Sequence, residues 1–212
     1  MHGSDSHAIS LGTSAILSSQ QVEDAISPYD VIGLLNQAKI SFVLAGAYGL
    51  SGWLGKPRAT QDVDVIVAVR HLKKATRVLL DAFPDLEADD QSVVIRLKQR
   101  ESQEVVIDLM KPNQSLYREA FKHTRTVEAK GHRYRIPSLE MALAMKFAAM
   151  LSPNRQEGDR YLDAHDFIHM VKRNQDIDVK MLLELGELVY NGGGANLVEK
   201  VRVVRAGEKL VL

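Results

Sequence analysis

Several segments of the chain repeat apolar residues every three or four positions, the spacing that puts them on one face of an α-helix. In residues 28–38 these apolar residues are Val31, Leu34, Leu35 and Ala38. Ser27 is suited to cap this helix and Pro28 to occupy its first position, so its start is well marked. We expect further helices at residues 47–54, 71–83, 138–151, 159–172, 178–190 and 196–206.

Other segments are dense in apolar and β-branched residues, which is typical of buried strands. The clearest is residues 61–69, which contain four valines and an isoleucine. Further strands are predicted at residues 41–45, 92–98, 104–109 and 134–136. The polar residues 99–103 join two of these strands, so an antiparallel hairpin is expected there. The acidic residues 84–90 are expected to form a loop.

These elements divide the chain into a mixed first part and an all-helical second part, with the change near residues 135–138. The prediction is an α+β protein, with a small mixed β-sheet and its helices over residues 21–136. A C-terminal helical domain is expected over residues 137–212. Residues 1–20 contain six serines and no aromatic residue, lysine or arginine, so we expect a flexible leader there.

Composition and charge exclude several classes of protein. The 212 residues hold 27 Lys and Arg against 27 Asp and Glu, unlike proteins that coat nucleic acid through bulk positive charge. The absence of cysteine excludes a disulfide framework and a cysteine-ligated zinc site. The best apolar stretch, residues 141–151, is broken by Lys146 and is shorter than the roughly 20 residues that a membrane helix needs. We therefore expect no membrane association and, by default, a cytoplasmic protein.

Two aspartates in the predicted strand 61–69 are the first candidates for chemistry. Side chains two positions apart in a strand point to the same side, so Asp62 and Asp64 should lie together, about 7 Å apart along the strand. Two carboxylates on one side repel each other unless a cation lies between them, and Mg²⁺ prefers such oxygen ligands. The pattern indicates a metal site, although an acidic strand face in water would have the same spacing.

A third carboxylate and a glycine turn add to this pair. Asp108 interrupts the otherwise apolar strand 104–109 and, if placed beside the pair, completes a three-carboxylate metal site suited to phosphoryl or nucleotidyl transfer. The alternative is that Asp108 only turns the chain before the next segment. Gly46 follows the strand 41–45 and starts a helix, so its backbone N–H groups are suited to bind phosphate. Lys56 and Arg58 are candidate phosphate contacts as well.

These motifs resemble the nucleotidyltransferase superfamily of the polymerase-β type. The chain is most similar to the small bacterial AbiEii-like nucleotidyltransferases, and the similarity covers about residues 28–172. It departs from them at Ala47, where many relatives have glycine or serine, and at Leu162, where a basic residue is common. The shared residues are Gly46, Arg58, Thr60, Asp62, Asp64 and Asp108, followed by Lys146, Arg155, Asp163 and Asp166.

The resemblance implies a mechanism. Asp62 and Asp64 would bind two Mg²⁺ ions that carry a nucleoside triphosphate (NTP), and Asp108 would bind the second metal and help to deprotonate an acceptor hydroxyl. That hydroxyl would attack the α-phosphate, and pyrophosphate would leave. The phosphates and the nucleotide would be held by Gly46, Ala47, Arg58, Thr60, Lys146 and Asp163.

The acceptor stays open at this point. It is an RNA such as tRNA, a protein hydroxyl or a small molecule, and the toxin branch of the family favours tRNA together with an antitoxin protein as partner. The alternative to an enzyme is a catalytically inactive module of the same fold that senses a nucleotide or binds a partner protein. Convergence of Asp62, Asp64 and Asp108 would favour the enzyme.

Three further features allow a simpler explanation. Residues 111–135 carry seven Lys and Arg against two Glu, which suits either an RNA acceptor or compensation of the acidic residues 81–90. His165 and His169 have metal-ligand spacing but no evident third ligand, so solvated histidines are expected. The glycines at 192–194 lack the Lys-Ser/Thr of a phosphate-binding loop, and we expect a turn between two helices there.

Overall fold

The structure is a computed structural model that describes residues 26–55, 60 and 62–211. The predicted leader, residues 1–20, and Arg58 lie outside the described residues. No helix in the described part is both long enough and apolar enough to cross a membrane.

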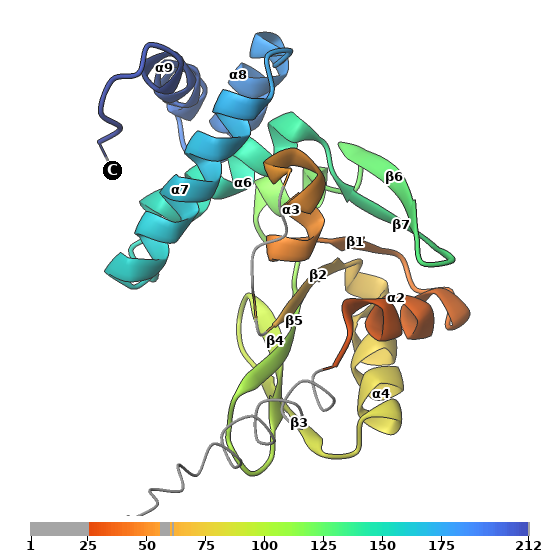
Figure 1. Ribbon diagram of the computed structural model, residues 1–212. Helices are drawn as coiled ribbons and strands as arrows, with labels where there is room; N and C mark the ends of the chain where they lie inside the picture. The colour runs from red at the N-terminus through yellow and green to blue at the C-terminus, as the bar shows by residue number, and fades with distance from the viewer. Residues whose placement is uncertain (1–25, 56–59, 61, 212) are drawn as a thin grey trace, which may run out of the picture.

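A five-stranded mixed sheet lies at the centre of the first part of the chain, as the fold-class prediction requires (Figure 1). Its strand order is β1-β2-β5-β4-β3. Only β2 and β5 run parallel, and the other neighbours are antiparallel. The strands are β1 (Phe42–Leu44), β2 (Val63–Val67), β3 (Leu86–Asp90), β4 (Val94–Gln99) and β5 (Val105–Met110).

One face of the sheet is covered by two helices, α2 (Pro28–Gln37) and α4 (Leu72–Ala82). Alternate residues of β2, and of β5 from Ile107 onward, point into this core, because successive side chains of a strand alternate between faces. Ser27 caps α2 by accepting a hydrogen bond from the N–H of Tyr29, as its position predicts. The buried residues on this face of the two strands are Val63, Val65, Val67, Ile107 and Leu109.

The other face joins a second core that belongs to both parts of the chain. Val43 and Ile66 of the sheet pack in the same cluster as Phe147 and Phe167 of the helical part. Figure 1 shows the later helices grouped at one end of the molecule, next to α3 (Gly46–Leu54). These later helices are α6 (Leu139–Leu151), α7 (Glu157–Arg173), α8 (Val179–Glu187) and α9 (Gly193–Arg205). The division at residues 136 and 137 stays a prediction, because the two parts share this core.

Most of the expected elements are present, and three differ. The acidic residues 84–90 were expected to form a loop, but Leu86–Asp90 is the edge strand β3, paired antiparallel with β4. A short helix, α5 (Ser115–Glu119), and a strand, β6 (Thr124–Ala129), were not expected. The predicted strand at 134–136 is part of β7 (His132–Pro137), which pairs with β6 to form a separate two-stranded sheet. Polar strands of this kind lack the apolar density from which strands were predicted.

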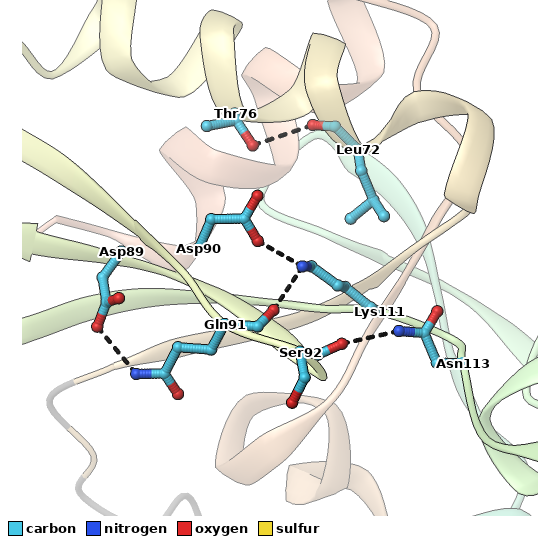
Figure 2. Close-up of polar contacts among 8 residues, drawn as sticks. All are labelled: Leu72, Thr76, Asp89, Asp90, Gln91, Ser92, Lys111 and Asn113. Carbon is cyan, nitrogen blue, oxygen red and sulfur yellow. Dashed lines mark hydrogen bonds and ion pairs between the residues drawn. The ribbon is translucent and has the colours of Figure 1, made fainter.

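Polar contacts explain why so acidic a segment forms a strand (Figure 2). Asp89 accepts a hydrogen bond from Gln91 at 2.9 Å, which Figure 2 shows. It accepts another from Lys98 of β4 at 2.6 Å. Lys111 contacts both Asp90 and the carbonyl of Gln91. The basic segment 111–135 therefore offsets the acidic segment through Lys111, whereas Lys122 and Arg133 pair with glutamates of the segment itself, Glu119 and Glu128.

The glycines between α8 and α9 form the expected helix–helix turn. Gly192 has a left-handed φ of 87°, and its N–H donates to Glu187 at 2.9 Å. A Cβ on Gly186 would lie 2.7 Å from the carbonyl oxygen of Gly193, so the two helices touch through their backbones. Close contact of this kind tolerates only glycine.

We expect Gly186→Ala to lower the free energy of unfolding by about 1 to 3 kcal/mol, because the added methyl group overpacks this contact. Gly158 of α7 has open space around its Cβ position and is the matched control. Gly158→Ala should raise the free energy of unfolding by up to about 1 kcal/mol through helix propensity. Urea denaturation measures both, and equal effects of the two substitutions would contradict the packing argument.

Candidate active site

Three aspartates meet on the open face of β2 and β5. The strands run parallel with Asp64 opposite Asp108, so both side chains point to the same side of the sheet. Asp62 lies two residues before Asp64 and points the same way. One carboxylate oxygen from each residue lies within 4.8 Å of the other two, which is the convergence that distinguishes a metal site from a solvated acidic strand.

Burial and mutual repulsion both act on these carboxylates. Burial, together with the negative charges of Asp62 and Asp108, raises the pKa of Asp64 to about 7. Burial also raises the pKa of Asp108 to about 6, although the nearby Arg96 opposes this rise. A positive charge placed among the three groups would relieve the repulsion, and the protein alone supplies too little of it.

The start of α3 lies against the same aspartates. Gly46 begins this helix with a left-handed φ of 55°, and a Cβ there would lie only 1.8 Å from Oδ2 of Asp64. No side chain caps the helix start, because its N-cap residue is Ala45. The N–H groups of Gly46 and Ala47 therefore begin an uncapped helix N-terminus beside the carboxylates, an arrangement that suits an anion such as phosphate.

Two side chains hold the outer aspartates in place. Thr60 donates its hydroxyl to Oδ1 of Asp62 at 2.5 Å. Nε of Arg96, on the neighbouring strand β4, lies 3.8 Å from Oδ1 of Asp108. This hydrogen bond from Thr60 orients one oxygen of the Asp62 carboxylate.

A second group of charges faces the aspartates from the helical part. Nζ of Lys146, on α6, lies 2.8 Å from Oδ1 of Asp163 and 2.7 Å from Oδ2 of Asp166, both on α7. Arg155, in the loop between these helices, brings Nε to 3.2 Å from Oδ2 of Asp163. Tyr117 is close enough to feel the charges of Arg155, Asp64 and Asp163, and burial raises its pKa to about 12, so its phenol stays neutral.

The two groups enclose a cleft of about 720 Å³. The predicted site residues that line it are Gly46, Thr60, Asp62, Asp64, Asp108, Lys146 and Asp163. Ala47 does not line it, and Arg58 lies outside the described residues. The lining residues that were not predicted as site residues are Glu104, Val105, Arg155, Asp159 and Leu162.

The unpredicted residues carry different sequence signals. Asp159 lies four residues before Asp163, so helix periodicity places both on one face of α7, whereas Leu162, next to Asp163, has no such signal. Arg155 belongs to the similarity described above but had no assigned role. Glu104 and Val105 reach the cleft only because the β4–β5 hairpin ends there.

The aspartate cluster also fits a divalent metal ion. Hard cations such as Mg²⁺ bind carboxylate oxygens, and all three groups present oxygens to one point. Among the described residues, these three form the sole cluster of potential metal ligands. The rings of His165 and His169 are tilted by 35° with centroids 4.3 Å apart, and neither residue belongs to such a cluster among the described residues.

Comparisons with known proteins agree on fold and family. The profile of the family described as "Nucleotidyl transferase AbiEii toxin, Type IV TA system" matches residues 34–202. A search of curated proteins finds no match. The chain is similar to an antigenic nucleotidyltransferase-like protein from Paracoccidioides brasiliensis, with 22% identity and a TM-score of 0.53. That match covers 86% of this chain and 94% of the other.

Two antibiotic-modifying enzymes show weaker similarity. One is the lincosamide antibiotic adenylyltransferase LnuA with lincomycin bound, at 15% identity and a TM-score of 0.46, covering 66% of this chain and 92% of that one. The other is ANT(2")-Ia in complex with adenylyl-2"-tobramycin, at 12% identity and a TM-score of 0.49, covering 90% and 96%.

The raised pKa of Asp64 predicts a pH-dependent penalty in the metal-free protein. The folded-state pKa of about 7 exceeds the ordinary value of 3.8, so the stabilising contribution is complete near pH 4 and is lost as the pH rises through 7. Asp64→Asn should therefore stabilise the metal-free protein at pH 8 by about 1 to 2 kcal/mol, less than the full shift because the side chain keeps some solvent contact.

Urea denaturation with a chelator, at pH 5 and at pH 8, measures this difference. The stability advantage of the variant should be smaller at pH 5, where only part of the contribution has been lost, and largest at pH 8. A variant that is less stable than the wild type at pH 8 would show that the carboxylates do not repel one another as the geometry requires.

Proposed function

Because the chain belongs to the AbiEii family of nucleotidyl transferases, we propose that it transfers a nucleoside monophosphate from an NTP to an acceptor hydroxyl. The observation that carries this proposal is the convergence of Asp62, Asp64 and Asp108 beside an uncapped helix N-terminus. Carboxylates that gather divalent cations, next to N–H groups that accept phosphate, are the two parts that nucleotidyl transfer requires.

Asp62, Asp64 and Asp108 would hold two Mg²⁺ ions. When bound, such ions neutralise the charge of the triphosphate and act as Lewis acids on its oxygens. The residues fit this role because their oxygens face one point, and because burial and neighbouring carboxylates raise the pKa values of Asp64 and Asp108. Thr60 orients the Asp62 carboxylate through a hydrogen bond, and the positive charge of Arg96 lies 3.8 Å from the carboxylate of Asp108.

The residues of the chain supply the remaining steps. Asp108, with a pKa of about 6, is ionised at neutral pH and accepts the proton of the acceptor hydroxyl. The hydroxyl oxygen forms a bond to the α-phosphorus, the bond from that phosphorus to the bridging oxygen breaks, and pyrophosphate leaves with the electron pair. The backbone N–H groups of Gly46 and Ala47 hold phosphate, and Arg58 and Thr60 contribute from the adjoining segment.

We propose an RNA acceptor, with tRNA tested first, and an antitoxin protein as partner. The family description names a toxin of a type IV toxin–antitoxin system, which supports both. Protein and small-molecule hydroxyls are the acceptors to test next. A nucleotide-sensing module without activity remains the alternative, and binding without transfer would distinguish it.

Thermal unfolding with each of the four NTPs, with and without Mg²⁺, tests the nucleotide site. A ligand at about 100 times its dissociation constant adds about 2.7 kcal/mol, which for a chain of this size raises Tm by roughly 5 to 10 °C. We expect such a rise with at least one NTP, only with Mg²⁺. Asp64→Asn should abolish both the rise and transfer of labelled nucleotide, while the protein stays folded.

Asp176→Asn is the matched control, because it removes the same charge from an exposed position outside the cleft. It should behave as the wild type does. An unchanged Tm with every NTP, or nucleotide transfer by the Asp64→Asn variant, would contradict the site assignment.

A further inference from the structure

The helical wall of the cleft contains an unusual buried charge cluster. Lys146, Asp163 and Asp166 are the buried charged side chains of the described residues, with 9%, 3% and 1% exposure. Buried ions are strongly unfavourable unless they are paired, so their positions are tightly constrained by one another. One lysine between two carboxylates leaves this group of three with a net charge of −1.

Arg155 completes the charge balance. Asp163 lies between two cations, because its Oδ1 receives Lys146 at 2.8 Å and its Oδ2 faces Nε of Arg155 at 3.2 Å. The chain of contacts therefore runs from the core outward, from Asp166 through Lys146 and Asp163 to Arg155.

Arg155 differs from Lys146 in the exposure of its side chain. Lys146 is 11% exposed at its side chain and is engaged by two carboxylates, whereas the Arg155 side chain is 47% exposed and lines the cleft. The guanidinium approaches Asp163 through Nε, so the other N–H donors of the fork can reach a ligand in the cleft. The positive charge of Arg155 acts on both Asp64 and Asp108 across the cleft.

We propose that Arg155 binds the β- and γ-phosphates of the nucleotide and the pyrophosphate that leaves, and that Lys146 positions Arg155 through Asp163. This inference rests on the proposed function, because it assigns a residue to the triphosphate of that reaction. The family resemblance implies that Lys146 contacts the triphosphate directly. Here its role is indirect, because it positions Arg155 through Asp163. Of the two cations described in the lining of the cleft, Arg155 has the more exposed side chain, at 47% against 11% for Lys146.

The chemistry of the two cations supports this division of roles. A guanidinium presents five N–H donors in a planar fork, so one edge can pair with a carboxylate while the other binds phosphate oxygens. The position of the Lys146 ammonium is fixed by two buried carboxylates, while its charge, like that of Arg155, also acts on Asp64. Asp163 connects the buried lysine to the cleft, because it contacts Lys146 on one side and the guanidinium of Arg155 on the other.

Calorimetric binding of magnesium pyrophosphate tests the inference, because this probe carries the phosphates without a base. Arg155→Gln should weaken its binding about tenfold, the effect of removing one charge-assisted contact. Arg155→Lys should recover only part of this loss, since one ammonium cannot both pair with Asp163 and reach the phosphates. Arg160→Gln is the matched control, because Arg160 lies in the first turns of α7, donates to the carbonyl of Met150 and does not line the cleft.

A double-mutant cycle tests the positioning role. Asp163→Asn leaves the Lys146–Asp166 pair in place, so the variant should fold, and it should weaken pyrophosphate binding severalfold. In the Arg155→Gln background the same substitution should have no further effect. Independent losses that multiply in the double variant would overturn the positioning role.

The outcomes separate the two proposals. If the wild type binds magnesium pyrophosphate and Asp64→Asn does not, the nucleotide site stands. Unchanged binding by Arg155→Gln would then overturn the inference on Arg155 alone. A wild type that binds neither pyrophosphate nor any NTP in Mg²⁺ would overturn both.

Discussion

The parallel, in-register pairing of β2 with β5 is the constraint on which the rest of the site depends. It places Asp64 directly opposite Asp108 on the same face, and the two-residue repeat of β2 adds Asp62. The result is electrostatically unfavourable, as the raised pKa of Asp64 shows. The structure maintains it because the alternate residues of the same two strands are buried in the core beneath α2 and α4. The strands thus have one face for stability and one for chemistry.

The helical part provides the complementary wall. Sheet residues such as Val43 and Ile66 share a core with Phe147 and Phe167, so the two walls of the cleft are held by common packing. The cluster around Asp163 is a second unfavourable arrangement, because it buries charges inside a helix pair. The cluster holds the positively charged Arg155 at the edge of a cleft that is otherwise lined mainly by acidic residues. Acids on the sheet and a cation on the helical wall suit a substrate whose phosphates lie between metal ions and a guanidinium.

Local patterns predicted most of the fold because they reflect local physics. Helix spacing located α2, α4 and α6, and dense β-branched residues located β2. The pattern failed at β3, whose acidic residues are satisfied by Gln91, Lys98 and Lys111 and not by burial. It also missed β6, whose partner β7 was only partly predicted. Pairing supplies the stabilisation of both strands, and pairing is not visible in the composition of a single segment.

By itself, the sequence determined the α+β class, the common side of Asp62 and Asp64, the glycine at the start of α3 and the family. It marked Asp108 as an acid out of place in an apolar strand. Only the tertiary structure decided that Asp108 faces Asp64, and that Lys146 is held by Asp163 and Asp166 while Arg155 lines the cleft. The reason is that side-chain periodicity acts over a few residues, whereas the register between strands and the partners of a buried charge depend on how distant segments pack.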